Sequence, residues 1–186
     1  MPGIVGLITK MPREWAEPQL LRMVKSLCHE AFYVTGVWID EPRGVYCGWA
    51  ERRGSFCEGM PVTNERADVS LVFSGEDFSD PGIARQLKDR GHDVGPTAPS
   101  YLVHLYEEDP KFPAGLNGRF HGLLADRTRG TATLFNDMER IGNASKPRWR
   151  RLCVQKDLEP AGGIEHPICR LRFGRSTVEL HRPVDV

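Results

Sequence analysis

The 186-residue chain lacks a long hydrophobic run and carries no excess of charge of either sign. No apolar stretch approaches the roughly 20 residues that span a bilayer, and the N-terminus has no basic segment followed by a hydrophobic one. The 25 basic and 25 acidic side chains cancel, so no chain-wide field attracts nucleic acid or anionic lipid. We therefore expect a cytoplasmic protein that binds neither a membrane nor nucleic acid.

The sequence also lacks the short spacings by which cysteine and histidine usually bind metals. Its five cysteines and six histidines are scattered, and neither C-x-x-C nor H-x-x-x-H occurs. An odd number of cysteines without an export signal argues against a disulfide framework. The sequence therefore predicts buried thiols, no metal site and no cofactor.

What is present is the composition of a globular protein, with 40% apolar and 27% charged residues. Residues 143–186 hold nine basic and five acidic side chains, whereas residues 1–142 hold 16 and 20. Four prolines interrupt the later segment, where only residues 154–158 and 168–173 are candidate elements. We predict a domain over residues 1–142 and a basic extension over residues 143–186. The extension contains a cluster of basic residues at 146–151, which is interpreted as solvated. Six residues with one aromatic side chain are a weak signal for a nucleic-acid-binding patch.

Hydrophobic periodicity over residues 1–142 predicts an α+β fold. One helix is expected to open at Pro18, a second to cover residues 81–90, and a third to open at Pro99. The third helix should place Leu102, Val103, Leu105 and Tyr106 on its apolar side. Short β-rich segments predict strands at residues 3–9, 32–39, 45–50, 55–56, 69–73, 118–125 and 131–135.

Several short motifs in this order resemble a known family. The chain opens with Met-Pro-Gly-Ile-Val-Gly-Leu and continues with Leu-Val-Phe-Ser-Gly-Glu-Asp-Phe at 71–78 and Tyr-Leu-Val-His-Leu-Tyr-Glu-Glu at 101–108. Leu-Asn-Gly-Arg-Phe at 116–120 then leads to Asp126-Arg127 and Asp137. Together these segments resemble the N-terminal glutaminase domain of asparagine synthetases, a class II glutamine amidotransferase of the N-terminal-nucleophile hydrolase type. The resemblance covers about residues 1–142 and implies a four-layer α/β/β/α sandwich.

The resemblance also implies a mechanism that this chain departs from. In the family the first methionine is removed, the exposed cysteine attacks the glutamine amide, and its own α-amino group acts as the base. Here Pro2 stands at the position of that nucleophile. The mechanism ties the thiol and the amine to one terminal residue, so no other cysteine can replace it.

The remaining functional positions of the family have also changed. Its Asn-Gly-Glu loop, which supplies oxyanion donors, reads Ser74-Gly75-Glu76 here. Ala98 stands where the family has the aspartate that holds the amino group of glutamine. His29 alone is kept from a His-Arg-Gly-Pro-Asp segment, and the arginine that clamps the glutamine carboxylate falls near Glu51 or Arg52.

These departures predict a catalytically degenerate amidotransferase domain that serves as a structural or partner domain of a synthetase-type enzyme. The family continues with an ATP-pyrophosphatase domain carrying a Ser-Gly-Gly-x-Asp-Ser phosphate loop, which this sequence does not contain. The pattern after Asp137 is also broken, which suggests a truncated or frame-disrupted relative. Two alternatives to this prediction stay open. In the first, the chain is an active glutamine-hydrolysing fragment. In the second, it is an enzyme that uses Pro2 as an N-terminal secondary amine.

Overall fold

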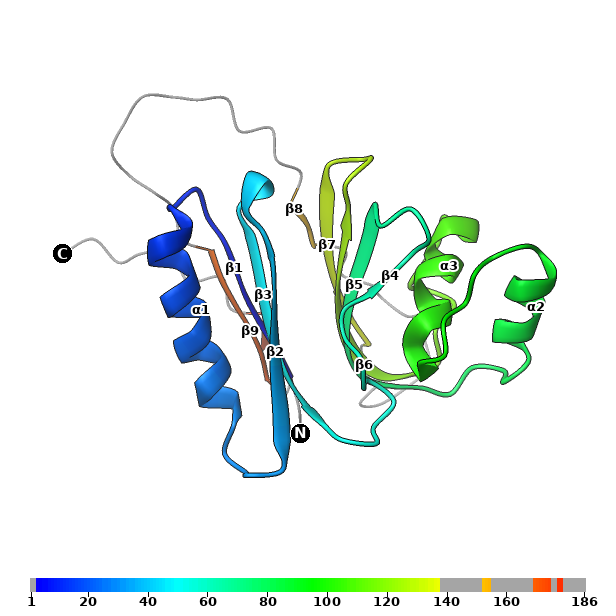
Figure 1. Cartoon of the computed structure of the whole chain (residues 1–186), viewed down its shortest axis with the longest axis horizontal. Helices are drawn as coiled ribbons and strands as arrows, with labels where there is room; N and C mark the ends of the chain where they lie inside the picture. The colour runs from blue at the N-terminus through cyan, green and yellow to red at the C-terminus, as the bar shows by residue number, and fades with distance from the viewer. Residues whose placement is uncertain (1–2, 138–151, 155–168, 175–176, 179–186) are drawn as a thin grey trace. The chain divides into compact units, whose positions relative to one another are not determined.

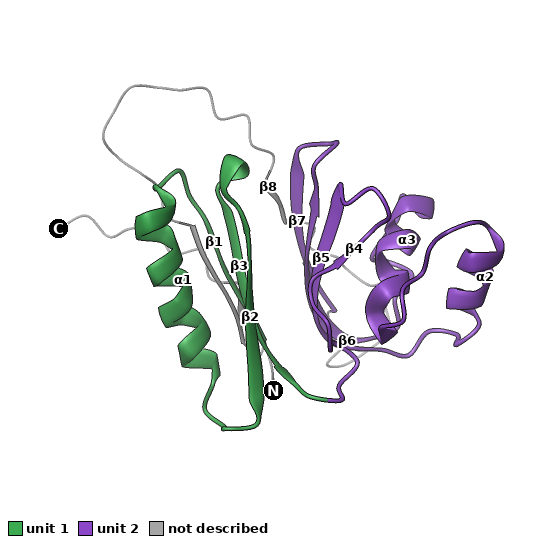
Figure 2. Cartoon of the chain, viewed as in Figure 1, with its two compact units in different colours: residues 1–53, 155–186 green, residues 54–154 purple. Residues whose placement is uncertain are grey.

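A computed structural model describes residues 3–137, 152–154, 169–174 and 177–178. The chain forms two compact units, one of residues 1–53 and 155–186 and one of residues 54–154 (Figure 2). In the described residues no helix is long and apolar enough to cross a membrane.

The first unit is an antiparallel sheet with one helix along a face (Figure 1). Its strand order is β10-β9-β1-β3-β2, so the first strand of the chain lies in the middle of the sheet. Its elements are β1 (Gly3–Ile8), α1 (Arg13–Leu27), β2 (Tyr33–Asp40), η1 (Glu41–Arg43), β3 (Val45–Arg52), β9 (Cys169–Gly174) and β10 (Thr177–Val178). The core between helix and sheet is made by Val5, Leu7, Ala16, Leu20, Val24 and Tyr46.

Helix α1 begins earlier than the sequence predicts, because Pro18 lies inside it rather than at its start. Proline there removes one backbone hydrogen bond of the helix. The apolar stripe nevertheless continues across it, since Ala16, Leu20 and Val24 are all buried against the sheet. Burial of that stripe outweighs the local preference of proline for a helix start.

The second unit is also an antiparallel sheet with helices packed beside it. Its strand order is β4-β5-β6-β7-β8, and α3 packs against β5 while α2 packs against α3 (Figure 1). Its elements are β4 (Val62–Thr63), β5 (Val69–Asp77), α2 (Ile83–Asp89), η2 (Ala98–Ser100), α3 (Tyr101–Glu108), β6 (Gly118–Asp126), β7 (Thr131–Asn136) and β8 (Leu152–Val154).

The α+β class is confirmed, and most predicted strands are present with shifted ends. The strand predicted at residues 55–56 is wrong, because these residues lie in a turn. Phe56 packs its ring edge-on against Phe73 and Tyr101 instead of pairing in a sheet. The helix predicted over residues 81–90 is shorter, since Asp80 accepts a hydrogen bond from the Gly82 amide in a turn that precedes α2.

Segments of the predicted extension pair with both sheets. Strand β8 pairs with β7, and β9 pairs with β1. The element predicted at residues 168–173 is thus present as β9, whereas residues 155–158, the boundary at Gly142 and the basic cluster at 146–151 lie outside the described residues. The residues after Gly142 therefore contribute strands at sheet positions that composition did not reveal.

Asp77 joins three segments of the second unit. It is buried at the end of β5, where Oδ1 accepts hydrogen bonds from the Ser79 hydroxyl at 2.9 Å and the Asn117 amide at 2.8 Å. Oδ2 accepts a bond from the Tyr101 hydroxyl of α3 at 2.5 Å. Burial, followed by the bond to Asp77, raises the pKa of Tyr101 far above its usual value.

We predict that Asp77→Ala lowers the free energy of unfolding by about 2 to 4 kcal/mol, because it leaves buried donors without their acceptor. Urea unfolding followed by circular dichroism measures the change, with Asp89→Ala on the exposed end of α2 as the control. Equal midpoints for the two variants would contradict the role given to Asp77.

Candidate functional site

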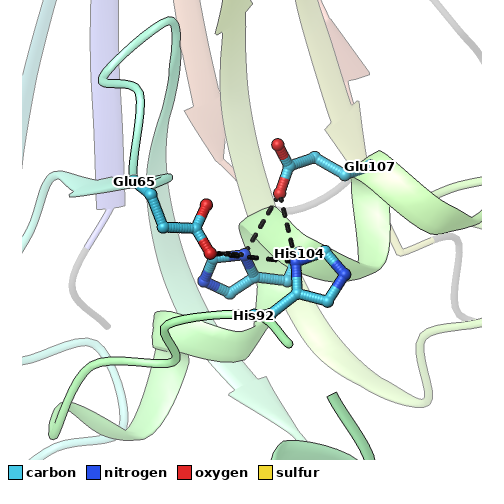
Figure 3. Close-up of side chains that lie close together, drawn as sticks. All are labelled: Glu65, His92, His104 and Glu107. Atoms are coloured by element: carbon cyan, nitrogen blue, oxygen red, sulfur yellow. Dashed lines mark hydrogen bonds and ion pairs between the residues drawn. The ribbon is translucent and has the colours of Figure 1, made fainter. Parts of the chain in front are cut away.

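Four ionisable side chains of the second unit point toward one another, as Figure 3 shows. They are Glu65, His92, His104 and Glu107, and one ligand atom from each lies within 4.8 Å of all the others. We call them the four-residue cluster. Two imidazoles and two carboxylates are donors that hold divalent metal ions in proteins.

Glu65 is positioned by the turn between β4 and β5. Asn64 fixes this turn, because its side-chain oxygen accepts hydrogen bonds from the amides of Asp68 and Val69 at 3.1 and 3.0 Å. Ala67 completes it with a φ of 53°, in the left-handed region that side chains other than glycine seldom adopt. The Glu65 carboxylate then accepts a bond from the Asp93 amide at 2.7 Å.

His92 is positioned by the end of α2. Gly91 has a φ of 99° and follows the C-cap residue Arg90, so the helix stops just before this glycine, as its place in the sequence predicts. The chain then turns back, so that the amides of Gly91 and His92 bond to the carbonyls of Lys88 and Leu87 at 2.9 and 3.1 Å. This left-handed cap brings His92 against α3.

Helix α3 supplies the other two members. His104 and Glu107 are three residues apart and therefore share one face of the helix. Their Nδ1 and Oε2 atoms are 3.1 Å apart. The apolar side predicted for α3 is partly wrong, because His104 is 1% exposed whereas Leu105 and Tyr106 are only half-buried.

The cluster has an electrostatic effect on Glu65. Partial burial raises the pKa of its carboxyl, but the hydrogen bond from the Asp93 amide and attraction to His104 and His92 outweigh it. The pKa of Glu65 is therefore lowered overall.

Local spacing could not reveal this cluster. Its members come from a turn, a helix end and a second helix, and only the His104-x-x-Glu107 pair is close in sequence. The expectation of no metal site was based on short Cys and His motifs alone. The prediction of buried thiols is confirmed for Cys47 and Cys57, whereas Cys28 is half-buried.

The positions that the family resemblance assigns are described in part. Pro2 lies outside the described residues, and Ser74, Gly75 and Glu76 lie near the end of β5. Ser74 is 4% exposed and pairs opposite His121 of β6, whereas Glu76 is exposed.

Gly75 is held in a conformation that only glycine can take. Its φ is 127°, and a Cβ atom would stand 2.0 Å from the carbonyl oxygen of Arg119. Its amide donates a hydrogen bond to Cys57 Sγ at 3.0 Å, and its carbonyl accepts one from the same thiol at 2.8 Å. The Cys57 thiol is therefore hydrogen-bonded to both the backbone amide and the backbone carbonyl of Gly75.

Ala98 is exposed in η2, next to the loop that holds Cys57. A Cβ atom at Gly59 of that loop would lie 2.9 Å from the Thr97 side chain. The loop thus contacts both Gly75 and the segment of Ala98. His29, Glu51 and Arg52 belong to the first unit, where His29 and Arg52 are exposed and Glu51 is buried.

A scan against protein-family models finds no match to this sequence, and a search of curated proteins finds no similar chain.

His121 gives the second unit a predictable pH dependence. Burial lowers its pKa below the ordinary 6.5, and attraction to Asp137 opposes the shift only in part. Because the unfolded chain takes up the proton first, this residue adds stability above pH 6.5 that is lost as the pH falls. We predict that His121→Gln flattens the fall in unfolding free energy between about pH 7 and 5.

Urea unfolding at a series of pH values measures this effect. The exposed His29 provides the matched control, because His29→Gln removes an imidazole of the first unit. Identical pH profiles for His121→Gln and the unsubstituted chain would contradict the prediction.

Proposed function

We propose that this chain is a catalytically silent relative of the glutaminase domain of asparagine synthetases. It keeps the scaffold and serves as a structural or partner domain for a synthetase-type protein with an ATP-pyrophosphatase domain. The observation that carries this proposal is the occupied Gly75 amide. A donor that is already bonded to Cys57 Sγ is not available to an oxyanion.

The sequence departures act in the same direction. Pro2 offers no thiol at the position of the nucleophile, and Ser74 lacks the side-chain amide with which asparagine would donate a hydrogen bond to the oxyanion. Removing one oxyanion donor costs about a hundredfold to a thousandfold in rate. Ala98 lacks the carboxylate that would hold the amino group of glutamine, which weakens binding by about tenfold to a hundredfold. Each loss affects a different step, so their effects multiply.

The helix packing within each unit supports the proposed four-layer sandwich. In the described residues α1 packs on the sheet of β1 and β3, and α3 packs on the sheet of β5. A sheet with helices on one face is the building block of that architecture.

We predict that the protein releases no ammonia from glutamine above background, and that Pro2→Cys alone does not change this result. The variant gains a thiol and a terminal amine, but the Gly75 amide stays bonded to Cys57. A coupled assay for ammonia measures the rate. The combined variant Pro2→Cys, Ser74→Asn, Ala98→Asp, Cys57→Ala should exceed Pro2→Cys measurably.

The matched control is the same combined variant with Cys57 retained, because it isolates the effect of freeing the Gly75 amide. Saturable glutamine hydrolysis by Pro2→Cys alone would show that the pocket is intact, and the proposal would then be withdrawn.

A further inference from the structure

His92 of the four-residue cluster is flanked by carboxylates on both ring nitrogens. Its Nε2 lies 3.1 Å from Glu108 Oε1, whereas its Nδ1 faces Glu107 Oε2 at 3.7 Å and Glu65 Oε1 at 3.9 Å. An ionised carboxylate only accepts hydrogen bonds, so Nε2 donates to Glu108. In the ring with its proton on Nε2, the Nδ1 lone pair faces the same space as the two Glu oxygens, so that these three atoms can bind one cation.

At His92 the distances favour a metal ion over a proton as that cation. A proton on its Nδ1 would serve a hydrogen bond of about 2.7 to 3.2 Å, which is shorter than the separations of 3.7 and 3.9 Å. His104 Nδ1 does lie within hydrogen-bond distance of Glu107 Oε2, at 3.1 Å, and a metal ion would replace that bond. Around zinc, with bonds of about 2.0 to 2.2 Å, neighbouring tetrahedral ligands stand about 3.3 to 3.6 Å apart. The four His-to-Glu separations in the cluster are 3.1, 3.7, 3.7 and 3.9 Å, which bracket that value.

The residues around the cluster orient its members as outer-shell partners do in metal sites. Glu108, which holds His92, is itself paired with Arg90 at 2.5 Å. Asn64 donates from Nδ2 to Glu107 Oε1 at 2.8 Å, so that Oε2 is the oxygen turned toward the histidines.

We propose that Glu65, His92, His104 and Glu107 bind one divalent transition-metal ion, for which zinc is the best match. Imidazole ligands exclude a preference for magnesium or calcium, which favour all-oxygen sites. Two carboxylates and two neutral imidazoles balance the charge of a divalent ion. The Glu65 side chain is 36% exposed and that of His104 only 2%, so the ion enters from the side of Glu65.

The bound ion would cross-link three segments that are distant in sequence. Glu65 lies in the β4–β5 turn, His92 follows α2, and His104 and Glu107 belong to α3. A ligand that binds only the folded chain raises its stability by mass action. The ion therefore stabilises the packing of α2, α3 and the β4–β5 turn in the second unit. This role does not involve glutamine chemistry.

The test uses the full, untagged chain stripped of metal with a chelator. We expect Co²⁺ to bind once per chain and to give visible d–d bands without a thiolate charge-transfer band. Zn²⁺ should displace it and raise the midpoint of thermal unfolding. His92→Gln and Glu107→Gln should each weaken Co²⁺ binding by at least tenfold, and Glu108→Gln by about tenfold to a hundredfold.

His29→Gln is the matched control, because it removes an exposed imidazole of the other unit and should bind Co²⁺ as the unsubstituted chain does. If Glu107→Gln fails to unfold cooperatively, Co²⁺ binding by the His92→Gln variant decides the test, because His92 is the more exposed of the two residues. Absence of Co²⁺ binding, binding that His92→Gln leaves unchanged, or a thiolate charge-transfer band would each overturn the proposal.

Discussion

The buried side chain of Asn64 makes four hydrogen bonds, and these bonds fix the β4–β5 turn against α3. Its oxygen closes the turn, while its Nδ2 bonds to Asp68 at 2.6 Å and to Glu107 at 2.8 Å. Because a buried amide without partners is costly, turn and helix are held in one arrangement. The carboxylates of Glu65 and Glu107 are consequently held in fixed positions relative to each other. The four-residue cluster therefore has a defined geometry although the helices and strands around it are short.

The second unit uses its polar groups differently at the positions that the family resemblance assigns. Gly75 has a backbone conformation that favours glycine, and the Cys57 thiol satisfies both its amide and its carbonyl. A satisfied backbone group stabilises the fold and is lost to catalysis. The proposed loss of glutaminase chemistry thus has a physical cause at this position, the hydrogen bond from the Gly75 amide to Cys57 Sγ.

Alternation of apolar residues was sufficient to predict the class of the fold and most of its strands. It failed where tertiary packing overrides local preference, as at Pro18 inside α1 and at Phe56, which packs in a turn. The cluster could not be predicted, since His104 looks like a polar interruption of an apolar helix until Glu65 and His92 are placed beside it. Sheet pairing of β8 and β9 was missed because short strands in mixed sequence have no detectable period.

The central claim is that the ionisable side chains of the second unit converge on a metal centre rather than on a glutamine pocket. Anomalous diffraction above the zinc absorption edge, from crystals of the full chain grown with Zn²⁺, tests this claim most directly. The account predicts one strong peak between Glu65, His92, His104 and Glu107, with each ligand atom about 2.0 to 2.2 Å away. A zinc peak on the cysteines, or no peak within the cluster, would contradict it.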